Sequence, residues 1–467
     1  MAKPPKATVL ADVYRTVSPE PLMNSEQLDA FYLQEIIDIR GTDVMLKLKT
    51  RLCRAEKDMP FKTFLMGHAG VGKSSALTCL IQEVEGKFQT VRFSAKKRLD
   101  MVNFKAFDVL LLTITELAEQ CGKSIDDGGS GEHISDNLIR PLWDWFSTTD
   151  ISKTEKTELA ATVGAGVDSS SSLWGKLIGL KAKVYAEAKY AGAREKKTVD
   201  YRLSNISELV QIANKIIDAC NNSLGEATGK QWLIIWEDFD KEGIPKESIS
   251  QLFLEYGHIF SDLNVNMITN IPVTLGYSGE ARSIIDTANR CLLHDSPVFD
   301  QEHNPHEQGR NVLREVVAKR MELTLFDEGI LEILLVASGG NLRDLFNMIL
   351  DACDQAIGKK LTTIAQAHAR NAIVTQRIEY ERRLGTDRFG KEVIKFEDKI
   401  GRLKAIYNNE PDSSRTDDIL FSLLRSRAVQ EFNGERWFGV HPLVVDYLVS
   451  NGHIETPENG EPFGGTT

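Results

Sequence analysis

The chain has 467 residues, of which 42% are hydrophobic and 26% charged, and its formal net charge is −11. This length exceeds what one hydrophobic core usually supports, so we expect a globular protein of two to four domains. The acidic balance argues against a protein that coats nucleic acid along its whole surface, although it leaves room for a local basic patch.

The cysteines and the apolar runs indicate the compartment. The six cysteines are scattered and form no C-x-x-C pair, which is typical of reduced thiols rather than disulfides or zinc ligands. The N-terminus carries no apolar signal core, and no apolar run approaches the roughly 18 residues of a spanning helix. The sequence therefore predicts a cytoplasmic protein with no transmembrane segment.

The first motif along the chain is GHAGVGKS at residues 67–74, which fits the phosphate-loop pattern G-x-x-x-x-G-K-[S/T]. Residues 61–66 predict a buried strand before it, and residues 75–81 predict a helix after it. Such a loop presents backbone N–H groups to phosphate oxygens at a helix N-terminus, where the helix dipole favours negative charge. This context favours a nucleotide-binding loop over a glycine-rich turn that contains GKS by chance.

The residues of this loop have distinct expected roles. Lys73 reaches the β- and γ-phosphates and takes part in catalysis, and the Ser74 hydroxyl ligates Mg²⁺. The glycines let the backbone curl around the phosphates. The residues expected to contact the nucleotide are Gly67, His68, Ala69, Gly70, Val71, Gly72, Lys73, Ser74 and Ser75.

Residues 90–231 form a long segment before the next site strand. Residues 107–117 predict a helix that packs on the core, and the stretch GAGVDSSSS predicts a flexible linker. Residues 173–189 mix large apolar residues with lysines. They fit an amphipathic helix for a membrane surface or a partner, and they equally fit a helix packed on its own domain or a mobile insertion.

Residues 232–241, WLIIWEDFDK, predict a strand that is buried on both faces and ends in carboxylates. Side chains at the carboxyl end of a parallel strand emerge where ligands bind in open α/β sheets. We therefore expect Glu237 to orient Mg²⁺ and Asp238 to position or polarise the attacking water. A solvated acidic turn is the alternative, and glutamate at the metal position leaves the division of roles open.

Further strands and helices follow in order. Residues 265–268 predict a strand whose tip, Thr269 or Asn270, can hydrogen-bond the γ-phosphate or the lytic water; an ordinary loop start is the alternative. Residues 281–290 predict a helix, and residues 291–293 predict a short strand. In SGGNLRDL, the glycine pair ends one helix and Asn341 caps the next.

Arg343 falls in the first turn of that helix, where a cation is unfavourable by about 0.3–1 kcal/mol. Its position suggests an external anionic partner, and pairing with Asp344 or another surface acid is the alternative. Near the C-terminus, residues 428–432 and 435–440 flank Asn433-Gly434, which is the strongest short hairpin signal.

The phosphate loop, LIIWEDFDK, TNIP and SGGNLRDL together resemble the AAA+ class of P-loop ATPases, in its STAND-like and initiator-like bacterial branch. The resemblance implies an α/β fold with a doubly wound parallel sheet, a helical lid and a C-terminal winged-helix-like domain. It makes Thr269 or Asn270 the first sensor and Arg343 the second. It makes Arg290 the arginine that acts across subunits, with Arg282 and Arg320 also available.

The resemblance divides the chain and suggests its function. The expected divisions are an N-terminal extension (1–30), an ATPase core (31–300) with a helical insertion (about 120–205), a lid (301–375), and a winged-helix-like domain with tail (376–467). We expect a cytoplasmic ATP- and Mg²⁺-dependent regulatory ATPase that forms a homo-oligomer. It would control a separate effector protein, in bacterial antiviral defence.

Two other functions stay open. The first is a DNA-binding ATPase of the initiator or transposition type, in which the winged-helix-like domain contacts DNA. Its basic residues are Arg415, Arg425, Arg427 and Arg436, of which the last three are the ones to replace in a test, although acidic residues are interleaved with them. The second is a nucleotide-binding scaffold that does not hydrolyse.

Overall fold

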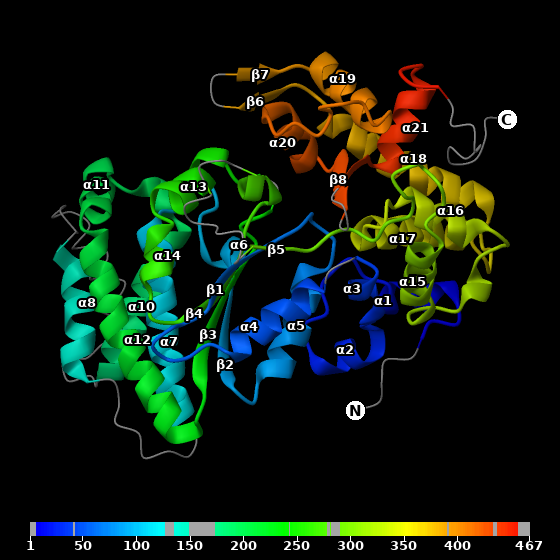
Figure 1. Cartoon of the computed structure of the whole chain (residues 1–467). Helices are drawn as coiled ribbons and strands as arrows, with labels where there is room; N and C mark the ends of the chain where they lie inside the picture. The colour runs from blue at the N-terminus through cyan, green and yellow to red at the C-terminus, as the bar shows by residue number, and fades with distance from the viewer. Residues whose placement is uncertain are drawn as a thin grey trace. The chain divides into compact units, whose positions relative to one another are not determined.

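The computed structural model describes residues 6–40, 43–126, 135–148, 173–241, 243–277, 281, 290–389, 392–432 and 437–455. The chain divides into two compact units (Figure 1). We call Leu48–Leu65 with Glu83–Cys291 the sheet unit, and Met1–Lys47 with Met66–Gln82 and Leu292–Thr467 the loop–lid unit. Each is described by itself. The domain boundaries suggested by the sequence stay predictions.

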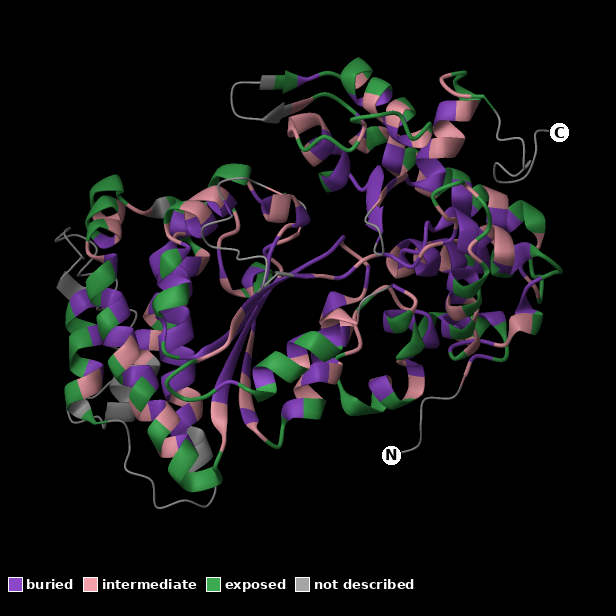
Figure 2. Cartoon of the chain, in the orientation of Figure 1, coloured by how far each residue is buried: buried purple, intermediate pink, exposed green. Residues whose placement is uncertain are grey.

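A five-stranded sheet has the order β2-β3-β4-β1-β5. Its strands are β1 (Lys62–Met66), β2 (Phe88–Ser94), β3 (Gln231–Glu237), β4 (Asn266–Asn270) and β5 (Arg290–Leu292). The pairs β1–β4, β4–β3 and β3–β2 are parallel. In β3 all residues after Gln231 are buried, as expected for a strand covered on both faces. Figure 2 shows the strands as a buried layer.

Helices flank this sheet. They are α6 (Ala95–Arg98), α7 (Ala106–Asp126), α8 (Asp136–Thr148), α10 (Leu173–Lys189), α11 (Lys196–Ser204), α12 (Ile206–Thr228), α13 (Lys246–Ser250) and α14 (His258–Asp262). The helix α12 buries Leu209, Ala213, Ile216 and Cys220, the three- and four-residue spacing of one helical face. Trp236 in β3 donates its indole N–H to the Thr113 hydroxyl of α7 at 2.9 Å, and this bond ties the helix layer to the sheet.

Two features of this unit decide or extend the predictions from sequence. Residues 173–189 form α10, which buries Leu180, Val184 and Ala188, and its Lys181 pairs with Glu116 of α7 at 2.8 Å. Of the alternatives, α10 is thus a helix packed on its own unit. The strand β2 was missed, although FQTVRFS has the aromatic and β-branched content of a strand. The Gly/Ser linker and most of the helix expected at 281–290 lie outside the described residues.

The loop–lid unit is mainly helical. Its helices are α1 (Val13–Thr16), α2 (Ser25–Phe31), α3 (Glu35–Asp38), α15 (Glu307–Ala318), α16 (Ile330–Ala337), α17 (Leu342–Gly358), α18 (Gln366–Arg383), α19 (Phe396–Tyr407), α20 (Asp418–Arg425) and α21 (Pro442–Ser450). The helices α4 (Val44–Cys53) and α5 (Lys73–Val84) run along the chain from one unit into the other. No helix in the described part of the chain combines the length and apolar character that a membrane crossing needs.

The helices α16 and α17 end and begin at the glycine pair and the asparagine cap that the sequence predicted. The helix α16 ends at Ala337, and Gly339 and Gly340 follow with φ of 58° and 77°. Asn341 then caps α17 by accepting a hydrogen bond from the Asp344 N–H at 3.4 Å.

The C-terminal part contains two hairpins. The strands β8 (Val429–Phe432) and β9 (Trp437–Val440) pair antiparallel and confirm the hairpin, while its Asn-Gly turn lies outside the described residues. A second pair, β6 (Asp387–Phe389) and β7 (Glu392–Ile394), was not predicted. The chain is therefore an α/β protein with a parallel P-loop sheet, a helical lid and a winged-helix-like C-terminal module, as the sequence predicted.

Candidate nucleotide site

The phosphate loop joins β1 to α5 in the predicted order. Gly67, Gly70 and Gly72 have φ of 144°, 92° and 101°, a region that side-chain-bearing residues rarely adopt. A Cβ atom at Gly67 would lie 2.4 Å from the carbonyl oxygen of Leu293, so this position accepts glycine only. The helix α5 begins at Lys73 and Ser74, which places both residues at its N-terminus.

Lys73 is held inside the curl of the loop. Its ammonium donates to the carbonyl oxygens of Gly67 at 2.6 Å and His68 at 2.8 Å, and the side chain is buried. A buried ammonium beside a glycine-rich helix N-terminus is the arrangement that offsets phosphate charge. The Ser75 hydroxyl accepts from the backbone N–H of Leu22 at 3.0 Å, and this bond ties the N-terminal segment to the loop.

The carbonyl oxygen of Ala69 accepts hydrogen bonds from two different parts of the loop–lid unit. It accepts from the Asn341 side-chain amide of α17 at 3.0 Å and from the Arg427 guanidinium at 3.3 Å. Arg427 lies between α20 and β8, in the C-terminal module. The phosphate loop is thus hydrogen-bonded both to the lid and to the winged-helix-like module.

Arg343 lies beside the loop, as expected for a residue in the first turn of α17. A Cβ atom at Gly70 would lie 2.6 Å from the Arg343 Cβ and 2.3 Å from the Asn341 Oδ1. The alternative was a pairing of Arg343 with Asp344 or another surface acid. Among the described residues no ion pair joins Arg343 to Asp344, whose carboxylate pairs with Arg427.

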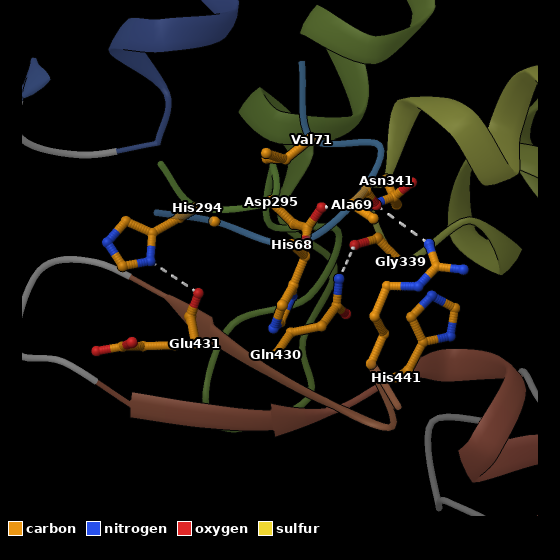
Figure 3. A network of polar contacts seen from close by, with 12 residues as sticks. His68, Ala69, Val71, His294, Asp295, Gly339, Asn341, Gln430, Glu431 and His441 are labelled. Atoms are coloured by element: carbon orange, nitrogen blue, oxygen red, sulfur yellow. Dashed lines mark hydrogen bonds and ion pairs between the residues drawn. The ribbon is translucent and has the colours of Figure 1, made fainter. Parts of the chain in front are cut away.

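Asp295 is a further residue that contacts the phosphate loop. Its carboxylate meets the His68 Nδ1 at 3.0 Å and accepts from the Asn341 amide at 2.9 Å (Figure 3). Burial alone would raise the pKa of Asp295. The hydrogen bond and charge of His68, the Gln430 side chain and the Arg40 charge outweigh it and hold that pKa well below its usual range. Asp295 is therefore a buried anion built into the loop's surroundings.

The Arg40 guanidinium lies on the other side of this cluster. It donates to the Val71 carbonyl oxygen at 2.9 Å and to the Ser296 hydroxyl at 3.1 Å. Burial lowers the pKa of Arg40 to about 10, which leaves the side chain charged at neutral pH. A positive charge thus stands beside the phosphate loop in addition to Lys73.

A polar cluster around Asp344 joins lid and C-terminal module. Arg427 approaches the carboxylate to 3.1 Å, and the Tyr380 hydroxyl and Gln376 amide of α18 donate to it at 2.7 and 2.9 Å. The Asp344 and Arg427 side chains are 1% and 7% exposed, so the pair is buried. Burial, with Asp344 nearby, raises the pKa of Tyr380 well above its ordinary value. The phenol therefore stays a donor.

His441 completes this cluster as a neutral imidazole. Burial lowers its pKa to about 4, and the ring stacks on Tyr380 with centroids 4.2 Å apart. Its Nδ1 accepts from the Leu443 N–H at 3.2 Å, so its Nε2 donates to the Ser338 carbonyl oxygen at 3.2 Å. Both ring nitrogens are satisfied without a charge.

The predicted acids lie at the end of β3 in the sheet unit. The Glu237 side chain is buried and pairs with the Arg92 guanidinium of β2. Asp238 follows with φ of 74°, a strained value for aspartate, and accepts from the Ser94 hydroxyl. Its other oxygen lies 3.5 Å from the Lys241 ammonium. The acidic turn is thus fixed by partners on β2 rather than solvated.

Thr269 and Asn270 end β4, which lies between β3 and β1 as predicted. In the strand register Thr269 is paired with Trp236 and Phe64, so the tip of β4 lies between the carboxyl ends of the other two strands. Asn270 is buried, and its Oδ1 has no hydrogen-bond partner among the described residues. This orphaned acceptor is the strongest sign of a function at the strand tip.

The candidate trans-acting arginines differ in their surroundings. Arg290 is the first residue of β5, and Arg282 lies outside the described residues. Arg320 is buried, donates to the Phe31 carbonyl oxygen at 3.1 Å and lies over the rings of Phe31 and Phe346. It therefore belongs to the interior of the loop–lid unit, which excludes it from acting on a second subunit.

The structure brings the candidate residues together in two groups. The loop, Asn341 and Arg343 share the loop–lid unit, and the ends of β3 and β4 share the sheet unit. Sequence reasoning missed Arg92. The signal that could have found it is the strand-like pattern of FQTVRFS, in which Arg92 stands between two apolar residues. Sequence reasoning also missed Asp295, Arg40 and the role of Arg427, for which no local pattern exists.

Arg427 also corrects the set of candidate DNA contacts. Its side chain is buried against Asp344, so it is not available to a duplex, whereas Arg425 is exposed. Arg436 lies outside the described residues. The assignment of Arg427 to DNA was wrong because its charge is used internally.

No protein-family model and no curated protein matches this chain. Solved structures do. The Walker-type ATPase PABY2304 of Pyrococcus abyssi is 11% identical over 93% of this chain and 99% of its own, with a TM-score of 0.40. Cdc6p from Pyrobaculum aerophilum is 10% identical over 96% and 98%, with a TM-score of 0.36. The Aeropyrum pernix ORC1 protein, solved in complex with DNA, is 12% identical over 90% and 97%, with a TM-score of 0.35. Similarities of this size assign neither a ligand nor a partner to this chain.

Proposed function

We propose that this protein is a cytoplasmic regulatory ATPase in which the lid and the winged-helix-like module respond to the state of the phosphate loop. The observation that carries the proposal is the Ala69 carbonyl oxygen, which accepts hydrogen bonds from Asn341 of the lid and from Arg427 of the C-terminal module. A displacement of the Ala69 carbonyl oxygen on nucleotide binding would act on both contacts.

Nucleotide binding is supported by the geometry of the loop. Three positive-φ glycines, the buried Lys73 ammonium and the start of α5 form the cradle that a triphosphate needs. Arg40 fixes the loop by donating to the Val71 carbonyl oxygen, and its charge balances that of Asp295. We take the nucleotide to be ATP. Ser74 would hold Mg²⁺, which would supply neutralisation of phosphate charge. The assignment of Glu237 to the metal stays a prediction, because its carboxylate pairs with Arg92 in this structure.

Hydrolysis needs a carboxylate near the attacking water and a polar strand tip. We assign the first role to Asp238, because Ser94 and Lys241 hold it in one position after β3. We assign the second to Asn270 rather than Thr269, because its Oδ1 is buried and unpaired among the described residues. Arg343 would sense the γ-phosphate from the lid, and Arg290 would act across a homo-oligomer interface.

The biological role rests on the resemblance alone. Control of a separate effector protein and a part in bacterial antiviral defence stay predictions. DNA contact through the winged-helix-like module also stays a prediction. It would have to use exposed residues such as Arg425, since Arg427 is committed to Asp344.

The proposal is tested by separating nucleotide binding from turnover. Lys73→Ala removes the ammonium that offsets phosphate charge, so affinity for ATP should fall. Asp238→Asn keeps the shape of the side chain but removes the carboxylate, so binding should survive while hydrolysis drops by on the order of 10²-fold. Arg290→Ala should reduce hydrolysis and leave monomer affinity nearly unchanged. A parent protein that binds ATP without any turnover would leave the non-hydrolysing scaffold as the function.

A further inference from the structure

A cavity of about 750 Å³ lies within the loop–lid unit, and its described lining contains no residue of the phosphate loop. It is enclosed by the segment 298–305, the helices α15, α16 and α21, and the hairpin of β8 and β9. A volume of this size is typical of sites that hold a ligand or several side chains of a partner. The proposed ATPase chemistry does not use it.

Fixed aromatic rings form part of its wall. The Trp437 ring stacks on Phe432 with centroids 4.4 Å apart. Gly439 makes this possible, because a Cβ atom there would lie 2.8 Å from the Trp437 ring. On another side Tyr407 stacks on His303, also at 4.4 Å. Rings held in this way present their faces and edges without loss of side-chain entropy, and aromatic faces attract cations.

The lining is strongly acidic. It holds six carboxylate side chains and two guanidinium groups: Asp300, Glu307, Asp327, Glu328, Glu332 and Asp446, against Arg310 and Arg314. Both guanidinium groups are already bound to one carboxylate, Glu332, at 3.3 and 2.7 Å. Arg310 also lies over the Phe299 ring, 4.9 Å from its centroid.

Three of the acids in the lining have no ion-pair partner among the described residues. These are Glu307, Asp327 and Glu328, and all three are exposed. Glu307 starts α15, and Asp327 and Glu328 precede α16, so the unpaired acids come from the N-terminal ends of two helices. An occupant that fits must carry cations outside an apolar centre.

We propose that this cavity, which we call the acidic aromatic pocket, binds a basic peptide segment of a partner protein, with an apolar side chain inside and arginine or lysine at the rim. Charge complementarity argues for the cations, and the presence of three unpaired acids on two helices argues for a chain that carries more than one of them. Guanidinium groups pair with carboxylates and stack on aromatic rings, so arginine suits both features of the wall. Binding here does not depend on the proposed ATPase function.

The pocket also touches the network around the phosphate loop. Gln430 lines the pocket, and its amide donates to the Gly339 carbonyl oxygen at 2.9 Å. The same side chain is hydrogen-bonded to Asp295, which holds His68. A peptide that contacts Gln430 would therefore contact a side chain that is itself hydrogen-bonded to Asp295, the partner of His68 in the phosphate loop.

The test uses the full-length chain without nucleotide and a fluorescein-labelled peptide amide, Leu-Arg-Phe-Arg, followed by fluorescence polarisation. We expect saturable binding that weakens with added salt, and at least ~5-fold weaker binding of the matched peptide Leu-Gln-Phe-Gln. Asp327→Asn with Glu328→Gln should weaken the arginine peptide by ~5-fold or more, and so should Trp437→Ala. Both rim acids are exposed, so this double variant should fold normally.

The matched control is Glu26→Gln with Asp29→Asn, two exposed acids on α2, which should leave the affinity within about 2-fold. Equal binding of the two peptides would overturn the charge argument. Equal weakening by the control pair would overturn the location, and absence of saturable binding would overturn the site itself. None of these outcomes bears on ATP turnover, which is measured separately.

Discussion

Replacement of Arg427 by methionine tests whether contacts of the C-terminal module stabilise the phosphate loop and the lid. The variant keeps an unbranched stem but removes the guanidinium with its charge and its hydrogen bonds to Asp344 and to the Ala69 carbonyl oxygen. Asp344 is 1% exposed and would remain as a buried carboxylate whose side-chain hydrogen bonds within the described part of the chain come from Tyr380 and Gln376. Such a removal typically costs about 3–5 kcal/mol.

For a unit of this size the cost corresponds to a fall in the melting temperature on the order of 10 °C. Differential scanning calorimetry of the full chain, which follows the transition that contains this unit, measures it. Hydrogen exchange at residues 67–72 should rise in the same variant, because the Arg427 hydrogen bond to the Ala69 carbonyl oxygen is gone. Adding Asp344→Asn removes the unpaired charge, so the double variant should recover most of the lost stability.

Arg425→Met is the control, since Arg425 is exposed and belongs to the same module. It should stay within about 0.5 kcal/mol of the parent. The reasoning would be refuted if Arg427→Met melted like the Arg425 control and exchanged no faster at the loop. That result would mean that the buried pair contributes neither stability nor contact.

Two further predictions follow from the same unit. Because burial lowers the pKa of His441 to about 4, the unfolded chain takes up this proton first as pH falls below about 6.5. Stability should then be lost between pH 6.5 and 4 by at most ~1.4 kcal/mol per pH unit, and His441→Gln should flatten that decline in melting temperatures measured from pH 7 to 4.5. An equally steep decline in the variant would contradict the assignment of a neutral buried histidine. Gly70→Ala adds a Cβ 2.3 Å from the Asn341 Oδ1 at φ of 92°, and should weaken ATP binding ~10-fold by titration calorimetry. Gly86→Ala, whose Cβ would meet nothing within 4 Å, is its control; equal affinities would show that the loop tolerates the change.

The parts of this molecule that sequence predicts are those in which local chemistry decides the structure. The glycines of the phosphate loop, the apolar run of β3, the Asn341 cap and the paired strands around Asn433-Gly434 each depend on neighbours within a few residues. Their predicted positions agree with the structure wherever the residues are described.

The parts that sequence did not predict depend on contacts over long separations. Arg427 reads as a surface cation of a winged helix, and only folding reveals that a buried aspartate 83 residues earlier takes its charge. Asp295 has no motif around it, yet it joins His68 to Asn341. Even α10, with its mixed apolar and basic residues, needed the structure to show that its apolar face packs on α7.

The central claim, that nucleotide at the phosphate loop is read by the lid and the C-terminal module, is tested most directly by hydrogen exchange of the full chain with and without ATP and Mg²⁺. We predict slower exchange with ATP at residues 67–75 and, in parallel, at residues 338–344 and 427–432. In Lys73→Ala both effects should be absent. Protection confined to residues 67–75, with the lid and the hairpin unchanged, would contradict the claim.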